Sequence, residues 1–172
     1  MEEVKNQECP FCHKKNLTLI EDIKDIPHFG KCYLMSMNCS NCKYHKSDVE
    51  SEEKKEPCKI TFTIKDKKDL KVTVVKSSEA DIKIPQMRMK VESGPSSIGY
   101  ITTIEGVLRR FKKIIEDDKD NAEDKDIKKK AKNLLKKLWK VECGEQELKI
   151  VIEDSSGNSA IISDKVEISK LK

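Results

Sequence analysis

Two Cys-x-x-Cys pairs in the first quarter of the chain constrain its fold more than any other feature. Cys9 pairs with Cys12 and Cys39 with Cys42, and 26 residues separate the two pairs. That separation allows a hairpin to fold back and bring four thiolates around one ion. Tetrahedral Zn²⁺ prefers such sulfur ligands, and four protein ligands leave no open position for chemistry. We therefore predict one structural Zn²⁺ in a binding module rather than in an enzyme.

Two other interpretations of these residues stay open. A Cys-x-x-Cys pair can be a redox dithiol, although neither pair lies in the βαβ pattern of thioredoxin-like proteins. His13 and His45 each lie close to a pair, so three cysteines and one histidine are an alternative ligand set. The remaining cysteines are isolated in the sequence, and we expect them to pack as small hydrophobic residues. They are Cys32, Cys58 and Cys143.

The segment around the cysteine pairs predicts a zinc ribbon over residues 1–49. Roughly forty residues cannot bury enough surface to fold unaided, whereas zinc binding contributes on the order of 10–16 kcal/mol in zinc-finger peptides. Residues 17–20 and 33–37 have strand-like composition, with turn residues between them. The charged run 50–56 (ESEEKKE) predicts a solvated linker or loop.

The rest of the chain, residues 50–172, predicts a β-rich domain that carries a helical hairpin over about residues 102–142. Apolar side chains alternate as in half-buried strands along residues 60–64, 72–74, 82–84, 87–91, 148–152 and 160–162, and a last edge strand is expected at 166–168. Thr102 and Glu105 have the spacing of a capping box at the start of the first helix. The predicted fold class is mainly β with an α insertion.

Both predicted helices are amphipathic. Apolar residues share one face of the first helix (Ile104, Val107, Leu108, Phe111, Ile114 and Ile115) and of the second (Ile127, Ala131, Leu134, Leu135 and Leu138). The second helix also carries lysines 128, 129, 130, 132, 136, 137 and 140, with Trp139 nearby. Lysines opposite a leucine stripe are usually the solvated face of a helix. They also support an alternative function, a zinc ribbon protein that contacts RNA or DNA through this helix.

Charge and composition limit the partners and the location of the protein. The chain has 35 basic and 31 acidic side chains, a net charge of +4, which does not by itself indicate nucleic-acid binding. No run of 18 apolar residues exists, so we predict no membrane-spanning segment. The polar N-terminus predicts no signal peptide. Seven cysteines without a secretory signal indicate a reducing compartment, so we expect a cytoplasmic protein.

Five segments in order give the chain a resemblance to the ZPR-type zinc-finger family: CPFC, IPHFGKCYLMSMNCSNC, VVKSSEADIKIPQM, GYITTIEGVL and EDSSGNSAII. The chain resembles one zinc-finger and β-rich unit of that family, as single-unit archaeal relatives do. The resemblance implies a double-stranded β-helix after the ribbon, with the helical hairpin inserted. It also implies that the protein binds translation elongation factor 1-alpha and assists its folding. Family members commonly have Gly where this chain has Lys43.

Two groups of residues are candidates for contact with a partner. The first is an apolar, methionine-containing stretch in a module too small to bury it fully, namely Phe29, Tyr33, Leu34, Met35 and Met37. The equal alternative is that this stretch packs the ribbon against the β-rich domain. The second group is Thr102, Thr103 and Glu105, in a segment that matches a family motif and begins a helix with free N–H groups. For this group a structural role in capping the helix is the preferred interpretation.

Overall fold

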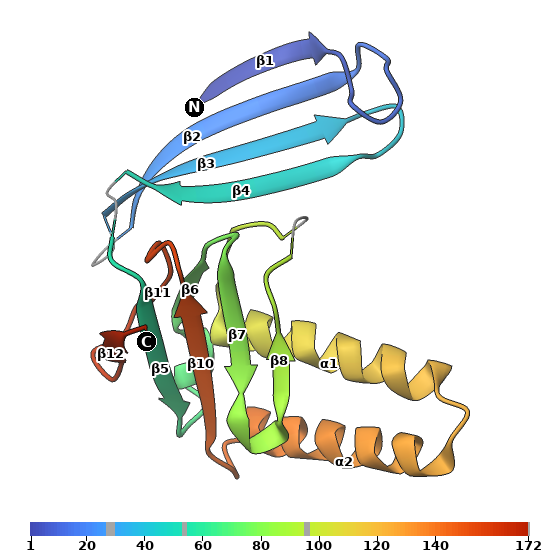
Figure 1. Ribbon diagram of the computed structural model, residues 1–172, viewed down its shortest axis with the longest axis vertical. Coiled ribbons are helices and arrows are strands. Elements are labelled where there is room, and N and C mark those ends of the chain that lie inside the picture. Colours follow the sequence, from blue (N-terminus) through green and yellow to red (C-terminus); the bar gives the residue numbers. More distant parts are fainter. Residues whose placement is uncertain (27–29, 53–54, 95–96, 172) are drawn as a thin grey trace.

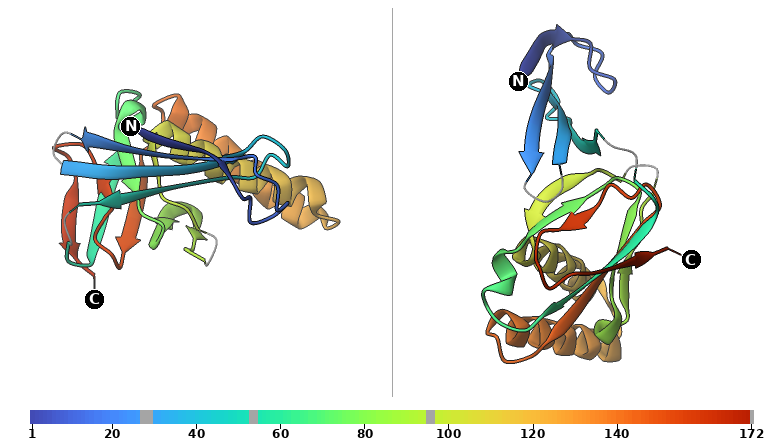
Figure 2. Two further views of the ribbon diagram at one scale, coloured as in Figure 1. Left: turned by 90° about the horizontal axis from the view of Figure 1, so that it is seen from above. Right: turned by 90° about the vertical axis from the view of Figure 1, so that its left-hand side faces the viewer.

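The computed structural model describes residues 1–26, 30–52, 55–94 and 97–171, which form a four-stranded sheet joined to a larger β structure (Figure 1). We refer to residues 2–51 as the ribbon and to residues 58–171 as the β domain. The ribbon lies at one end of the molecule, and the two helices project from one side of the β domain (Figure 2). The fold is mainly β with a helical insertion, as predicted. The predicted division of the chain at residues 49 and 50 stays a prediction.

The ribbon is an antiparallel sheet in sequence order. Its strands are β1 (Glu2–Gln7), β2 (Leu17–Ile26), β3 (Gly30–Cys39) and β4 (His45–Ser51). The β2–β3 register runs from Leu17 opposite Cys39 to Ile26 opposite Gly30. Strands β1 and β4 were not predicted, because they have few apolar residues and every residue of β1 is exposed. Strand β4 also occupies the start of the predicted linker.

The β domain contains two further sheets. The larger has the strand order β12-β5-β10-β7-β8 and the smaller has the order β11-β6-β9. Their bounds are β5 (Cys58–Ile64), β6 (Thr73–Lys76), β7 (Ala80–Ile84), β8 (Met89–Val91), β9 (Tyr100–Thr103), β10 (Leu148–Asp154), β11 (Ala160–Ile161) and β12 (Glu167–Lys170). Two short 3₁₀ turns, η1 (Asp69–Lys71) and η2 (Pro85–Met87), connect some of these strands. The second turn contains Met87, which the alternating pattern had wrongly placed in a strand.

A single apolar core fills the β domain. It joins buried side chains of both sheets with those of the two helices, including Phe62 from β5, Val74 from β6 and Ile150 from β10. Because strand side chains alternate, Ile60, Phe62 and Ile64 all reach this core, as their spacing predicted. Cys58 packs against the same core as a partly buried residue.

The helical hairpin is inserted between strands β9 and β10. It consists of α1 (Ile104–Asn121) and α2 (Lys125–Glu142), which pack against each other. The two views agree that the far end of the hairpin projects beyond the sheets (Figures 1 and 2). Neither described helix is long and apolar enough to cross a membrane.

The start of α1 differs by one residue from the prediction. Thr103, not Thr102, is the N-cap, and its hydroxyl oxygen accepts the backbone N–H of Gly106 at 3.2 Å. Glu105 therefore does not complete a capping box and instead pairs with Arg109 one turn later, at 3.0 Å. The shift arises because β9 continues through Thr103, so Thr102 still pairs with Val74 in the sheet.

Helix α2 ends at Glu142, shortly before Gly144. This residue has a φ of +75°, its N–H donates to the carbonyl of Val141, and the N–H of Glu145 donates to that of Lys140. These two bonds form the Schellman arrangement, in which glycine adopts the left-handed conformation without a Cβ clash.

Two residues of the predicted apolar helix faces are more exposed than expected. Ile114 is 38% exposed and Ile127 is 47% exposed. Ile114 lines a cavity together with Ile82 and Val91 of the larger sheet, and Ile127 lies in the first turn of α2, next to the loop that joins the two helices. The helical spacing was correct, but both side chains remain partly open to solvent.

An apolar cluster joins the ribbon to the β domain. Ile26, Cys32 and Val49 of the ribbon are buried together with Val75 of β6. Leu34, Ala160 and Ile162 pack against this group. A polar contact adds to it, because the carboxylate of Asp48 accepts the backbone N–H of Gly99 at 3.0 Å. Cys32 thus packs as a small hydrophobic residue, as expected.

Candidate metal centre

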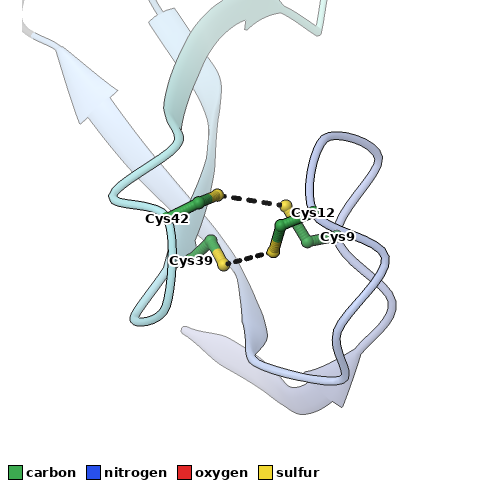
Figure 3. A group of neighbouring side chains, drawn as sticks. All are labelled: Cys9, Cys12, Cys39 and Cys42. Atoms are coloured by element: carbon green, nitrogen blue, oxygen red, sulfur yellow. Dashed lines mark hydrogen bonds between the residues drawn. The ribbon is translucent and has the colours of Figure 1, made fainter.

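The four cysteines of the two pairs meet at one end of the ribbon (Figure 3). Cys9 and Cys12 lie in the loop between β1 and β2, and Cys39 and Cys42 in the loop between β3 and β4. The two loops are adjacent because the long β2–β3 hairpin places Leu17 opposite Cys39. The 26 residues between the two cysteine pairs therefore form a hairpin that brings the pairs together, as the sequence predicted.

The sulfur atoms are arranged as a tetrahedral ion would require. All four lie within 4.8 Å of one another, with Cys9 and Cys42 sulfurs 3.6 Å apart and Cys12 and Cys39 sulfurs 3.7 Å apart. Four sulfurs at about 2.3 Å from a central Zn²⁺ would be roughly 3.8 Å from each other. The cluster therefore fits one structural Zn²⁺ bound by four thiolates.

Backbone turns hold each pair in position. The carbonyl of Cys9 accepts the N–H of His13 at 2.9 Å, and that of Cys39 accepts the N–H of Lys43 at 3.0 Å. The fourth residue after each first cysteine has a left-handed backbone, with φ of 55° at His13 and 62° at Lys43. The two Cys-x-x-Cys loops, here called the knuckles, thus have the same turn. Neither has glycine at the left-handed position, although this conformation costs most residues roughly 1–2 kcal/mol.

The electrostatics of the cluster favour a bound cation. A backbone hydrogen bond from Lys14 outweighs burial and lowers the pKa of Cys12 to about 6. A backbone hydrogen bond from Tyr44 acts in the same direction on Cys42. Burial and the neighbouring sulfurs oppose it, however, and the pKa of Cys42 rises to about 12. Four thiolates this close together repel one another, so full ionisation of the cluster requires a compensating positive charge.

Apolar and aromatic residues surround the sulfurs. Cys9, Cys39 and Leu17 are buried together, with Met37 and Tyr44 packed against them. The ring of Phe11 lies against that of Tyr44, with 4.6 Å between centroids, although Phe11 is 70% exposed. Phe11 and Tyr44 were not among the site residues predicted from the sequence. The only signal for this ring pair is an aromatic residue within the first cysteine pair and another just after the second.

Neither histidine of the alternative ligand set belongs to the cluster. The Nδ1 atom of His13 lies 3.4 Å from Glu8, and that of His45 lies 2.7 Å from the side-chain oxygen of Asn38. In the part of the chain that the structure describes, the grouped ligand atoms are those of the four cysteines alone.

The first group of candidate partner contacts lies on β3. Tyr33, Met35 and Met37 alternate with Leu34 and are partly buried. Met37 packs beside the metal centre, whereas Met35 lines a cavity of about 350 Å³ with Gly99 and Ile101 at the boundary with the β domain. Phe29 lies outside the described residues. Contact of these residues with a partner stays a prediction.

The second group lies at the junction of β9 and α1. Thr103 caps the helix, Glu105 pairs with Arg109, and Thr102 pairs with Val74 in the sheet. Only Thr103 caps the helix, so the preferred interpretation of this group as a helix cap holds for that residue alone. Their contact with a partner also stays a prediction.

Comparisons with known proteins agree with the two-part architecture. Residues 3–57 match a family model described as the ZPR1 zinc-finger domain, and residues 68–171 match one described as the ZPR1 jelly-roll domain. The chain is 36% identical to a ZPR1-like protein of Methanocaldococcus jannaschii, over 97% of this chain and 85% of that protein. It is 34% identical to a ZPR1-like protein of Pyrococcus horikoshii, over 99% of this chain and 78% of that protein.

The chain also resembles one part of longer eukaryotic proteins. It is 31% identical to a fission yeast protein named zinc finger chaperone, from Schizosaccharomyces pombe, over 89% of this chain but only 33% of that protein. The chain thus spans about a third of the length of this relative.

Proposed function

Because this chain belongs to the ZPR1 family of zinc-finger and jelly-roll proteins, we propose that it is a cytoplasmic, non-enzymatic protein that binds translation elongation factor 1-alpha and assists its folding. The name of the fission yeast relative, zinc finger chaperone, supports a protein client. The elongation factor itself is inferred from the resemblance of the five sequence segments to the family.

The observation that carries the proposal is the combination of a closed metal centre with a partly exposed apolar strand. Four cysteines supply all the ligands of a tetrahedral ion, so the ion would have a structural role. The ion would fix β2 and β3 in register and so present Tyr33, Met35 and Met37 on one side of β3. Methionine-rich surfaces adapt to partners because the side chain is unbranched and polarisable.

Binding to purified elongation factor 1-alpha tests the proposal. We expect the zinc-loaded protein to capture the nucleotide-free factor, and the double variant Met35→Ser, Met37→Ser to bind it at least about tenfold more weakly, since each buried methionine contributes roughly 1.5–3 kcal/mol. Ile168→Ser is the matched control, because Ile168 is 72% exposed on β12 and far from the ribbon in sequence.

Two results would count against the proposal. One is a zinc-loaded protein that never associates with nascent or nucleotide-free factor. The other is a double variant that binds as well as the parent. A thermal melt of each variant separates lost contact from lost folding, because packing roles for Met35 and Met37 would lower the melting temperature as well as the affinity.

The lysine-rich face of α2 supports a second candidate function in nucleic-acid binding. Ala131, Leu138 and Val141 are buried against the rest of the molecule, which leaves seven lysines of this helix exposed beside Trp139, itself 55% exposed. If this face binds RNA or DNA, the affinity should fall steeply with salt and with charge reversal at Lys136 and Lys137. If no salt-dependent complex with RNA or DNA forms, binding of a protein client remains the proposed function.

A further inference from the structure

A cavity in the β domain, remote from the metal centre in sequence, combines apolar walls with three cationic side chains, those of Lys76, Arg110 and Lys113. It has a volume of about 470 Å³ and lies among β6, β7, β8, β9 and α1. Its apolar lining includes Ile82, Val91 and Phe111, and its polar lining includes Lys76, Ser97 and Arg110. Pockets that bind small molecules have volumes of roughly 300–1,000 Å³ and place a few polar groups in an apolar lining.

Lys76 is the unusual residue of this cavity, because it is only 3% exposed. Its ammonium donates to the carbonyl of Ser77 at 2.8 Å and to the hydroxyl of Ser97 at 3.4 Å. These acceptors are neutral, and the described residues give the ammonium no ion-pair partner. A buried charge that no carboxylate contacts directly is costly unless other interactions offset its desolvation.

The surrounding charges do not remove this cost. Burial lowers the pKa of Lys76, and the positive charge of Arg110 acts in the same direction. Asp154, Asp81 and Asp48 raise the pKa through space, but they do not reverse its net decrease. The ammonium is therefore a donor that an anion entering the cavity would stabilise.

Arg110 places a second positive charge at the same cavity. Its guanidinium lies over the ring of Tyr100, 4.0 Å from the centroid, and the Lys76 ammonium lies 5.6 Å from that centroid. Arg110 is exposed, and within the described ranges it too has no ion-pair partner. Tyr100 thus holds an exposed guanidinium and a buried ammonium near one aromatic ring, with the apolar wall of Phe111 also lining the cavity.

We propose that this cavity binds a small organic carboxylate with an apolar body, whose carboxylate contacts Lys76 and Arg110 while its body packs against Val91 and Phe111. A single negative charge fits better than two, because only one ammonium is buried there and Asp117 also lines the cavity. A guanidinium and an ammonium are the side-chain donors that carboxylates prefer. The proposal does not depend on the function proposed above.

Titration of the zinc-loaded protein with phenylacetate, followed by amide NMR, tests this binding site. We expect saturable shifts at Ser97, Tyr100 and Phe111, with binding at least about tenfold weaker for the neutral analogue phenylacetamide, since the amide cannot form charge-assisted hydrogen bonds through an anionic oxygen. Lys76→Met should weaken phenylacetate binding by a similar factor. Lys112→Met is the control, because Lys112 is on α1 but does not line the cavity.

Several outcomes would overturn the proposal. They are an absence of saturable shifts at millimolar phenylacetate, equal binding of phenylacetamide, and unchanged binding by Lys76→Met. The same shifts with inorganic phosphate alone would show a general anion site and would also overturn it. If Lys76→Met does not fold, Arg110→Met decides the question, because Arg110 is exposed: weaker phenylacetate binding supports the proposal, and unchanged binding overturns it.

Discussion

At the scale of single residues, Asp69 shows how a buried charge can be satisfied. Its carboxylate is 4% exposed, pairs with Lys165 at 2.7 Å and accepts the backbone N–H groups of Lys65 and Asp66. Burial alone would raise the pKa of Asp69, but the Lys165 ammonium and the two N–H groups outweigh it and hold the pKa below its usual range. The charged form is therefore the one that stabilises the fold.

We expect Asp69→Asn to lower the free energy of unfolding by about 1–3 kcal/mol at pH 7. Because the pKa of Asp69 is lower in the folded than in the unfolded state, its contribution is complete above an unfolded pKa of about 3.9 and is lost as the pH falls through the folded pKa. The difference between parent and variant should therefore shrink below about pH 4. Urea unfolding across this range measures it, and Asp164→Asn, at an exposed position, is the matched control. A difference that does not depend on pH would contradict this assignment.

At the same scale, Lys43 shows that a departure from a family pattern need not change the geometry. Family members commonly have glycine here, yet Lys43 adopts the left-handed backbone with φ of 62°. The equivalent His13 has φ of 55°, so the first knuckle accepts the same conformation without glycine. The sequence identifies the substitution, and only the coordinates show that the turn is kept.

At the scale of elements, the junction of β9 and α1 separates two adjacent threonines. We expect Thr103→Ala to destabilise the protein by about 1 kcal/mol, because the N–H of Gly106 loses its capping oxygen. Thr102→Ala is the matched control and should cost clearly less, since the hydroxyl of Thr102 is not the cap of α1. Urea unfolding of both variants provides the measurement. A larger effect at Thr102 would restore the sequence-based capping box and contradict the structure.

At the scale of the whole molecule, the two parts depend on different sources of stability. Among the residues that the structure describes, the β domain has a continuous core of 21 buried residues, whereas around the sulfurs the ribbon buries only Leu17 with Cys9 and Cys39. Removal of the metal by a chelator under reducing conditions should therefore unfold the knuckle end of the ribbon and leave the β domain folded. Loss of the metal removes the main stabilising term of such a small module.

Amide NMR can follow the two parts separately during chelation. We expect the signals of Leu19 and Met37 to lose dispersion while those of Phe62 and Ile150 keep theirs, and added Zn²⁺ should restore the first set. Retention of all ribbon signals without metal would contradict a structural role for the ion. Simultaneous unfolding of both parts would contradict their independence.

The amino-acid sequence by itself determined the features that depend on local spacing. Two cysteine pairs predicted the metal centre because a Cys-x-x-Cys turn sets its own geometry. Alternating apolar residues predicted strands such as β5, β7 and β10 because the side-chain period of a strand is two. Helical spacing likewise predicted the hairpin, although it could not show that Ile114 and Ile127 would be partly exposed.

Only the tertiary structure decided the features that depend on residues distant in the chain. Asp69 and Lys165 are 96 residues apart in sequence, and nothing local to either predicts their pairing. Lys76 is one of 35 basic residues, and its burial beside Ser97 and Arg110 follows from the packing of β6 against β9 and α1. The physical reason is that desolvation depends on which elements surround a side chain, and chain topology fixes those neighbours rather than the residue's own segment.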